Sequence, residues 1–376
     1  MAPERKPGRA RWALAAAPLA LLVLLELAAR LVLGAPASPM IVTNSLQRPE
    51  RYFTTQGDQV LATYDSGAAS FAAHSPRPRL VFLGGSSVSG GSRLNPGQEF
   101  PDLVASKLAL EPLNLAGGGR DSQDAVGILG EALAWSPVGA VLYLGHNDYG
   151  NLYFRAHFDS AWESLTVRAR SSLHQLWSFA LLRRAITREN PRITQPGAAQ
   201  TGGAKTLGDH KVDPAQVAKA TLQLAANLER AHDLLRAAGL PMILVLPASD
   251  LSCEPLGSKE PEALAAYQQG MALRHQDPAQ GASLLRRARD LDWVTIRAHS
   301  DATTVMRRLA EAHPEVVLVD TQAHLLREPG LDIPASDLFS DCVHLSVSGH
   351  QAMAELIAEG ICRAGLLPGI ADCGAY

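Results

Sequence analysis

Short apolar runs alternate with longer amphipathic stretches from Leu80 onward, and this pattern predicts strands that alternate with helices. The expected strands are 80–83, 112–115, 140–144, 242–246 and 315–319. The expected helices are 100–110, 121–134, 158–187, 214–238 and 348–364. Alternation of this kind is typical of α/β proteins, so we expect a doubly wound parallel sheet of about five strands.

One long insertion interrupts this alternation between the fourth and fifth strands. Residues 255–313 carry a helical pattern with no strand signal. Within it, 267–270 is followed by Ala282, Leu285 and Ala288, a spacing that resembles one tetratricopeptide-type helix pair. Two interpretations stay open. The insertion is either a helical hairpin packed on the main domain, or a surface that binds a protein partner or covers the substrate.

The N-terminal region predicts a membrane anchor. Residues 1–11 are basic, and the nearly unbroken apolar run 12–33 is long enough to cross a bilayer as a helix. Positive charge before the span places the N-terminus in the cytoplasm. The alternative is a cleaved signal peptide, because Ala35, Pro36 and Ala37 form an A-x-A site. Both interpretations export the rest of the chain, and the anchor predicts a single-pass inner-membrane protein whose folded domain faces the periplasm or the extracellular side.

The remaining divisions follow from composition. We expect 34–78 to be a linker with one or two edge strands, and 79–376 to be the folded domain. The Gly-, Thr- and Pro-rich segment 190–210 should be a flexible loop. The chain of 376 residues is 47% hydrophobic, has a net charge of −3 and only 5% aromatic residues, and shows no basic stripe, so nucleic acid is not an expected partner.

The four cysteines all lie in the predicted exported part, in agreement with an oxidising compartment. They form no C-x-x-C pair and no zinc-finger spacing, so we expect no metal. We expect Cys253 to pair with Cys342, because both would lie after strand ends on one face. We expect Cys362 to pair with Cys373, because the two are close in sequence.

Candidate chemistry gathers directly after the expected strands. The first strand is followed by a Gly- and Ser-rich turn, 84–91, which could serve a nucleophile or a phosphate. A phosphate loop needs a lysine, and the first basic residue here is Arg93, outside that spacing. Three other blocks carry similar residues. Block 114–119 begins at the end of the second expected strand, block 145–148 follows the third, and block 341–344 precedes the last helix. Parallel strands end at one edge, so these blocks should meet there and could supply a serine nucleophile, its base and oxyanion donors.

Together and in this order, the four blocks resemble those of the SGNH/GDSL hydrolase superfamily. The resemblance implies a three-layer α/β/α sandwich of the flavodoxin-like type. It also implies a role for each of five residues: Ser86 as nucleophile, His344 as general base, Asp341 as its orienting partner, and the Ser86 N–H, the Gly119 N–H and the Asn147 amide as oxyanion donors. One departure is Gly85, which stands where the family usually has an aspartate. A second is the run Gly117-Gly118-Gly119, which leaves the donor glycine ambiguous by a position or two.

The implied function is an exported serine esterase or deacylase without a cofactor or a metal. Its substrate would be an ester, such as an O-acetyl or short acyl group on a carbohydrate or lipid. A cell-surface polysaccharide O-acyltransferase is the first alternative, since a sugar hydroxyl can replace water. A catalytically inactive, membrane-tethered binding or assembly protein is the second.

Each candidate residue also has a simpler interpretation. Ser87 and Ser89 could be the nucleophile in a shifted register, or turn hydroxyls that bond the local backbone. Asn147, Asp148 and Asp341 could be turn or helix-capping residues. Segments 149–157 and 249–262 are expected to be loops that shape the pocket. The other histidines show no ligand spacing and are expected at the surface or satisfied in the core; they include His146, His299, His313, His324 and His350.

Overall fold

The computed structural model describes residues 23–25, 27–28, 52–62, 70–90, 94–95, 97–158, 211–257, 260–325, 334–366 and 373. The chain divides into one unit of residues 1–42 and 160–203 and a second unit of residues 43–159 and 204–376. The strands and helices of the central fold all belong to the second unit. Within the described residues, no helix has the length and apolarity needed to cross a bilayer. Most of the predicted anchor, nearly all of the predicted helix 158–187 and all of loop 190–210 lie outside the described residues.

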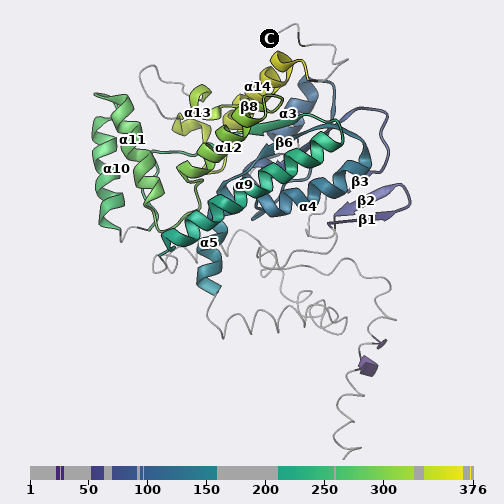
Figure 1. The fold of residues 1–376 in the computed structure, drawn as a ribbon, viewed down its shortest axis with the longest axis horizontal. Coiled ribbons are helices and arrows are strands. Elements are labelled where there is room, and N and C mark those ends of the chain that lie inside the picture. Colours follow the sequence, from purple (N-terminus) through teal and green to yellow (C-terminus); the bar gives the residue numbers. More distant parts are fainter. Residues whose placement is uncertain are drawn as a thin grey trace, which may run out of the picture. The chain divides into compact units, whose positions relative to one another are not determined.

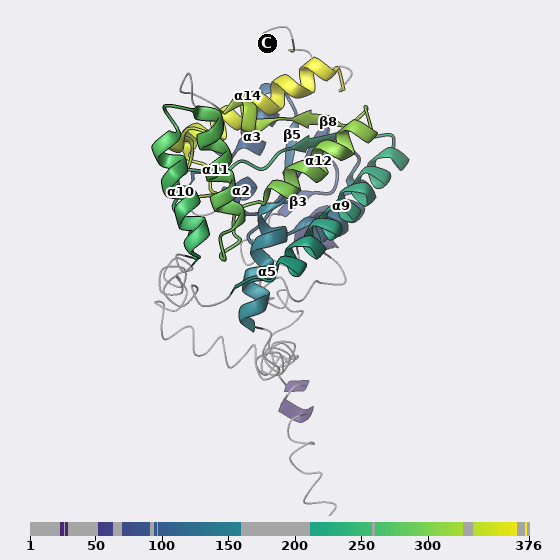
Figure 2. The same ribbon diagram turned by 60° about the vertical axis from the view of Figure 1, so that its left-hand side comes forward.

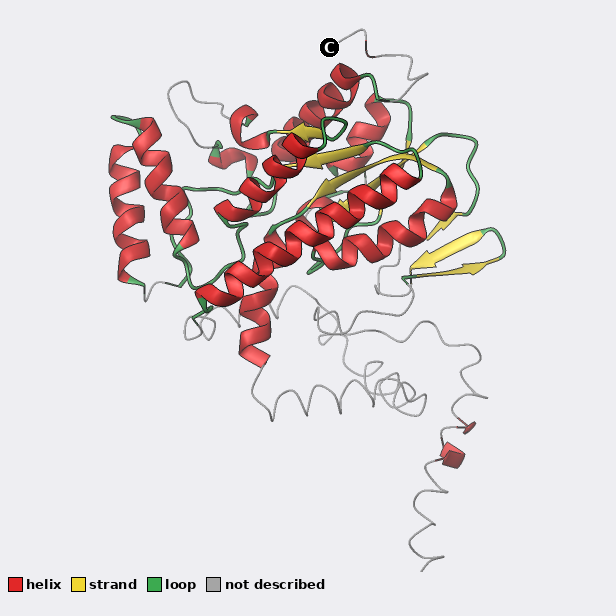
Figure 3. Cartoon of the chain, in the orientation of Figure 1, coloured by secondary structure: helices red, strands yellow, loops and turns green. Residues whose placement is uncertain are grey.

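A five-stranded parallel sheet forms the centre of this unit, as predicted (Figures 1 and 3). Its order is β5-β4-β6-β7-β8, and Phe82 of β4 pairs with Val141 of β6, which pairs with Ile243 of β7. The strands are β4 (Arg79–Gly84), β5 (Glu111–Asn114), β6 (Pro137–Tyr143), β7 (Met242–Val245) and β8 (Val317–Val319). All strands therefore end at one edge, where the predicted site residues follow them.

Helices cover both faces of the sheet, which makes the predicted three-layer α/β/α sandwich (Figure 2). One layer pairs α3 (Phe100–Lys107) with α14 (Val347–Ala364), and the other contains α4 (Ser122–Ala132), α9 (Pro214–Ala237) and α12 (Ser300–Ala312). Short elements complete this part: α2 (Ser86–Ser89), η2 (Leu133–Trp135), α13 (Thr321–His324) and η5 (Ser336–Leu338).

Local sequence signals explain where the principal helices begin. Asp121 and Asp213 each close a capping box at the start of α4 and α9, and Pro214 occupies the first turn of α9. Ser346 caps α14 by accepting a hydrogen bond from Gly349 N–H. These capping interactions determine where α4, α9 and α14 begin. Strand β4, which leads into the Ser86 turn, is buried along its whole length.

The insertion contains a helical hairpin, as predicted. Helices α10 (Pro261–Leu273) and α11 (Pro278–Asp290) lie side by side in both ribbon views (Figures 1 and 2). Two glycines permit the close approach: a Cβ on Gly270 would lie 2.9 Å from Leu285 Cγ, and one on Gly281 would lie 2.7 Å from Arg274 Cα.

Two predictions about local structure were wrong. Segment 149–157 is part of helix α5 (His146–Phe158) rather than a loop, because the helix starts directly after Gly145 at the end of β6. The N-terminal strands form an antiparallel sheet of their own instead of edge strands. They are β1 (Phe53–Gln56), β2 (Gln59–Ala62) and β3 (Ser70–Ala72).

Aromatic packing and hydrogen bonds hold this small sheet against the end of α4. The rings of Phe53 and Phe71 contact the Trp135 ring edge-on, at centroid distances of 4.7 and 4.9 Å. Tyr52 N–H and Phe53 N–H also donate to the Glu131 carboxylate on α4. The sheet is therefore attached to the end of α4.

Both expected cysteine pairings are present. Cys253 is bonded to Cys342, and Cys362 is bonded to Cys373. The first disulfide joins the segment after β7 to the loop before α14, and the second joins the end of α14 to the C-terminal tail.

Candidate active site

The turn after β4 presents Ser86 at the carboxyl edge of the sheet. Gly84 ends the strand so close to β6 that a Cβ would lie 2.4 Å from the Tyr143 carbonyl oxygen. Ser86 then begins the single-turn helix α2, which ends at Gly90 with a φ of 70°. Glycine is required where the chain packs this tightly or adopts a left-handed conformation. The local sequence therefore aims a serine hydroxyl outward from the sheet edge.

Ser86 and His344 meet across 258 positions of sequence. The Ser86 Oγ lies 2.8 Å from His344 Nε2, and His344 Nδ1 lies 2.8 Å from Asp341 Oδ2. A carboxylate at Nδ1 holds the proton on that nitrogen and leaves Nε2 to accept the serine proton. The structure therefore brings together the three side chains that the sequence named as nucleophile, base and orienting acid.

Asp341 also organises the loop that carries the histidine. Its Oδ1 accepts hydrogen bonds from Val343 N–H at 2.9 Å and His344 N–H at 2.8 Å. Burial by itself would raise the pKa of Asp341, but the bonds from the His344 side chain and from these two backbone groups outweigh it and lower the pKa below its usual range. The carboxylate stays ionised beside the imidazole, so capping and orienting are combined in one residue.

Three further contacts hold this loop in place. Ser340 N–H donates to the His344 carbonyl at 2.8 Å, and Asp250 N–H donates to the Cys342 carbonyl at 3.1 Å. The buried Ser87 hydroxyl donates to the Val343 carbonyl at 3.0 Å. The simpler interpretation expected Ser87 to bond the local backbone, and the structure shows a bond to a distant carbonyl instead. The spacing could not reveal this, because its partner lies 256 positions away.

Asn147 lies in the first turn of α5, next to the Ser86 turn. Its Nδ2 donates to the Arg120 carbonyl at 2.8 Å, which uses one of the two amide hydrogens. A Cβ on Gly85 would lie only 2.2 Å from that nitrogen. The glycine that replaces the family's usual aspartate thus makes room for the Asn147 amide, and a larger side chain would displace it.

Gly119 lies in the loop between β5 and α4, and Asn151 bonds this loop. Gly119 has a φ of 75°, and its carbonyl accepts a hydrogen bond from Asn151 Nδ2 at 3.0 Å. The same nitrogen lies 3.2 Å from Asp121 Oδ2, and the Asn151 side chain is buried. Sequence reasoning missed Asn151, although its position one helical turn after Asn147 would have indicated it had the segment been read as a helix.

Asp148 joins α5 to α4. Its two carboxylate oxygens accept hydrogen bonds from Ser122 N–H and Gly145 N–H, each at 3.1 Å. Burial and the nearby Asp121 charge raise the pKa of Asp148 to about 6. Asp148 is therefore not the N-cap residue of α5; it lies in the first turn of that helix and bonds the backbone just before α5 and at the start of α4.

Two of the remaining histidines are satisfied core residues, as expected. His146 Nδ1 accepts a bond from Ala298 N–H at 3.0 Å, and burial lowers its pKa to about 3. His350 Nδ1 accepts a bond from Phe100 N–H at 3.1 Å, and burial lowers its pKa to about 4. Both imidazoles are neutral at physiological pH.

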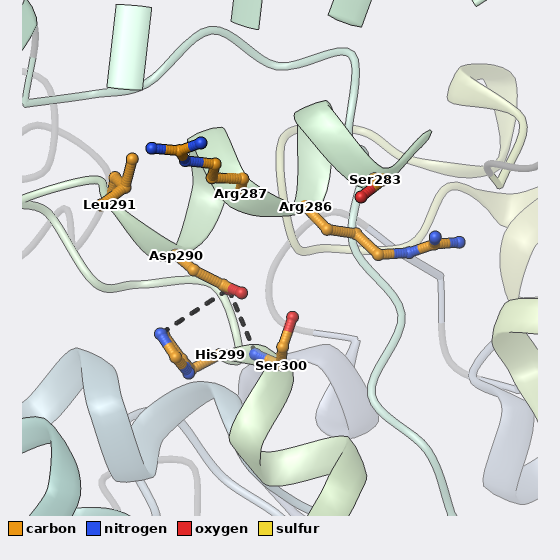
Figure 4. Close-up of a pocket in the computed structure, with 7 residues that line it drawn as sticks. All are labelled: Ser283, Arg286, Arg287, Asp290, Leu291, His299 and Ser300. Atoms are coloured by element: carbon orange, nitrogen blue, oxygen red, sulfur yellow. Dashed lines mark hydrogen bonds and ion pairs between the residues drawn. The ribbon is translucent and has the colours of Figure 1, made fainter. Parts of the chain in front are cut away.

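A separate cavity of about 400 Å³ lies where α11 meets the start of α12 (Figure 4). Asp290 in its wall accepts a hydrogen bond from Ser300 N–H at 3.1 Å and lies 4.0 Å from His299 Nε2. Its lining consists of Ser283, Arg286, Arg287, Asp290, Leu291, His299 and Ser300. None of the predicted site residues belongs to it, so this cavity is distinct from the Ser86 site.

Solved structures of similar proteins share a low level of sequence identity with the chain. A GDSL-like lipase from Bacteroides thetaiotaomicron is 14% identical with a TM-score of 0.38, over 76% of this chain and 88% of that one. The acetyl xylan esterase AlAXEase is 14% identical with a TM-score of 0.39, over 74% and 97%. A member of the lipolytic protein G-D-S-L family from Veillonella parvula is 12% identical with a TM-score of 0.36, over 75% and 96%.

The search of curated proteins gave no match. The family model for the GDSL-like lipases and acylhydrolases matches residues 80–357, which is most of the chain and contains all four blocks. The chain therefore belongs to the GDSL-like lipase/acylhydrolase family and is an enzyme that acts on ester bonds.

Proposed function

We propose that this chain is an exported serine esterase or deacylase in which Ser86, His344 and Asp341 carry out the reaction. The observation that carries the proposal is the continuous hydrogen-bonded path from Ser86 Oγ through His344 to Asp341, at 2.8 Å for each step. This geometry is the one that activates a serine hydroxyl in unrelated acyl-transfer enzymes.

The reaction proceeds through a covalent acyl-enzyme. His344 Nε2 takes the proton from Ser86 Oγ as the oxygen attacks the ester carbonyl, and the resulting imidazolium protonates the departing alcohol. Water then attacks the acyl-serine and loses a proton to His344, and the acid is released as the bond to Ser86 Oγ breaks and His344 returns that proton to Ser86 Oγ. Asp341, ionised throughout, stabilises the imidazolium that forms in each half of the reaction.

The oxyanion of the tetrahedral intermediate would be bound between the two loops beside Ser86. The Ser86 N–H, the Gly119 N–H and the second hydrogen of the Asn147 amide are the proposed donors. The bonds of Asn147 to Arg120 and of Asn151 to the Gly119 carbonyl support this role, because they hold both donor groups before substrate arrives.

The proposed substrate is an O-acetyl or short acyl ester on a carbohydrate or lipid outside the cytoplasm. The apolar run 12–33 supports a membrane-anchored enzyme that faces the periplasm or the extracellular side. Two disulfides agree with an oxidising compartment.

Transfer to a polysaccharide hydroxyl is the second candidate. The His344 side chain is 32% exposed and that of Asp341 is 33% exposed, so a sugar hydroxyl could reach the acyl-serine in place of water. Incubation with an acetylated glycan and a non-acetylated acceptor distinguishes the two. Free acetate alone supports hydrolysis, and a newly acetylated acceptor supports transfer.

A serine-reactive fluorophosphonate probe followed by peptide mapping tests the nucleophile. We expect the label on Ser86, and we expect Ser86→Ala to lose both the label and all detectable turnover of p-nitrophenyl acetate. Ser87→Ala removes a hydroxyl one position away together with its bond to the Val343 carbonyl, and it should still keep the label on Ser86 and most of the activity. A label on Ser87, or the reverse pattern of activities, would contradict the proposed register.

A further inference from the structure

Two histidines and two glutamates gather on the helical layer of α9 and α12, away from the Ser86 turn. Glu229 and His232 lie one turn apart on α9, while His313 and Glu315 lie in the short connection between α12 and β8. Helices α9 and α12 run side by side in both ribbon views (Figures 1 and 2). The fold thus brings together two pairs of residues separated by about eighty positions.

The polar atoms of this cluster converge. His232 Nε2 lies 2.9 Å from Glu315 Oε1, and His313 Nε2 lies 3.0 Å from Glu229 Oε2. One ligand atom from each of Glu229, His232 and His313 lies within 4.8 Å of the others. Tetrahedral zinc, with bonds of about 2.0–2.1 Å, holds neighbouring ligand atoms about 3.3 Å apart. Small side-chain rotations would therefore bring these atoms to ligating positions.

The imidazoles of His232 and His313 differ from those of ordinary surface ion pairs in their stacking and burial. Their rings stack with centroids 3.9 Å apart, and His232 is only 2% exposed. Its Nδ1 is buried without a hydrogen-bond partner among the described residues. Each ring presents its Nε2 to a glutamate oxygen, so the two imidazoles and the carboxylates face one another across a short distance.

We propose that Glu229, His232 and His313 form a binding site for one divalent transition-metal ion, with Zn²⁺ as the best fit. Imidazole and carboxylate together suit zinc, and three such protein ligands leave the fourth tetrahedral position to a water molecule. Both glutamates are more than half exposed, so the ion can enter from solvent and their side chains can adjust to it. The ion would link α9 to the segment before β8.

This site could not be predicted from the sequence because its ligands come from two distant segments. Glu229 and His232 have a helical i, i+3 spacing that is common on exposed helices, and His313 was expected to be an ordinary surface or core histidine. The expectation of no metal rested on cysteine and histidine spacing, which does not detect ligands assembled by tertiary contact.

Zinc binding to the full-length chain, purified without a polyhistidine tag and stripped with a chelator, tests the proposal. We expect isothermal titration with ZnCl₂ to show one saturable site, and Co²⁺ to give the visible absorption of a tetrahedral complex. Loss of an outer-shell partner alone typically costs about 10–100-fold in metal affinity, so His313→Ala and Glu229→Gln should weaken zinc binding by about 100-fold.

His275→Ala is the matched control, since it removes an exposed histidine outside the cluster and should leave zinc affinity unchanged. The His313 and Glu229 side chains are partly or largely exposed, so their variants should fold even if a variant of the buried His232 does not. Absence of saturable zinc binding would overturn the proposal. So would binding that His313→Ala and Glu229→Gln leave unchanged. Esterase activity does not enter the measurement, so the outcome is independent of the proposed function.

Discussion

The turn after β6 and the loop before α14 each bring a histidine to the carboxyl edge of the sheet. The two imidazoles differ in burial and in the partner of Nδ1. His146 is buried, and its Nδ1 accepts a backbone N–H from Ala298 at 3.0 Å. His344 is about one-third exposed, and its Nδ1 faces the Asp341 carboxylate at 2.8 Å. The first ring is fixed as a neutral core residue, whereas the Nε2 of the second lies 2.8 Å from the Ser86 hydroxyl.

The comparison shows that the partners of the two ring nitrogens decide what a histidine can do. His146 lies within the block 145–148, directly beside Asn147, and so stands at the same edge of the sheet as His344. A backbone donor at Nδ1 leaves the proton on Nε2, so that nitrogen cannot accept one from a serine. A carboxylate at Nδ1 has the reverse effect.

Replacing the carboxylate partner should have the largest effect. Asp341→Asn removes the group that fixes the His344 tautomer, and we expect kcat/KM for p-nitrophenyl acetate to fall by about 10⁴. Asp233→Asn, which removes an exposed carboxylate on α9, should leave kcat/KM within about twofold. An Asp341→Asn enzyme with nearly full activity would show that the carboxylate contributes little to the base.

Loss of the Asn147 amide, next to His146 in the chain, should have the second-largest effect. Asn147→Ala removes a proposed oxyanion donor, and we expect kcat to fall by about 10²–10³ with a smaller change in KM. Asn95→Ala, at an exposed position, is the matched control. Equal losses in both variants, or a change confined to KM, would argue against transition-state stabilisation by Asn147.

The smallest effect should be seen in the pH dependence of stability. The pKa of His146 is lowered to about 3 in the folded protein from an ordinary value of 6.5, so the unfolded chain binds more protons between these values. The stability that this residue contributes is present above pH 6.5 and is lost as the pH falls. Between pH 6.5 and pH 5 the loss should be about 2 kcal/mol.

Urea unfolding of the parent chain and of His146→Gln at these two pH values measures that contribution. The variant should lack this part of the acid destabilisation, while the similar part from His350 remains in both proteins. Identical pH slopes in the two proteins would mean that His146 titrates normally in the folded chain.

Much of the fold could be predicted because its signals are local. The apolar strand β4 and the glycine turn after it can be read from about a dozen adjacent residues. The same is true of α9, which has an Asp-Pro start and a glycine stop. The candidate catalytic residues also lie in short blocks, and the parallel sheet brings those blocks to one edge.

The features that sequence reasoning missed depend on distant partners. Helix α5 has few apolar residues in its first turns, so its helical character is weak in the sequence alone. Ser87 bonds Val343, and Asn151 bonds Gly119, and neither contact follows from spacing. The small sheet of β1–β3 needs the Trp135 ring to pack against. Each of these contacts exists only once the tertiary fold has formed.

The disulfide between Cys253 and Cys342 has a consequence for where the enzyme can mature. Cys342 lies between Asp341 and His344, so this covalent bond anchors the segment that carries the general base to the segment after β7. Chain synthesised in a reducing cytosol would lack the crosslink, which typically contributes about 2–4 kcal/mol. Recombinant material for assays should therefore be produced in an oxidising host compartment, where the base-bearing segment is fastened as it folds.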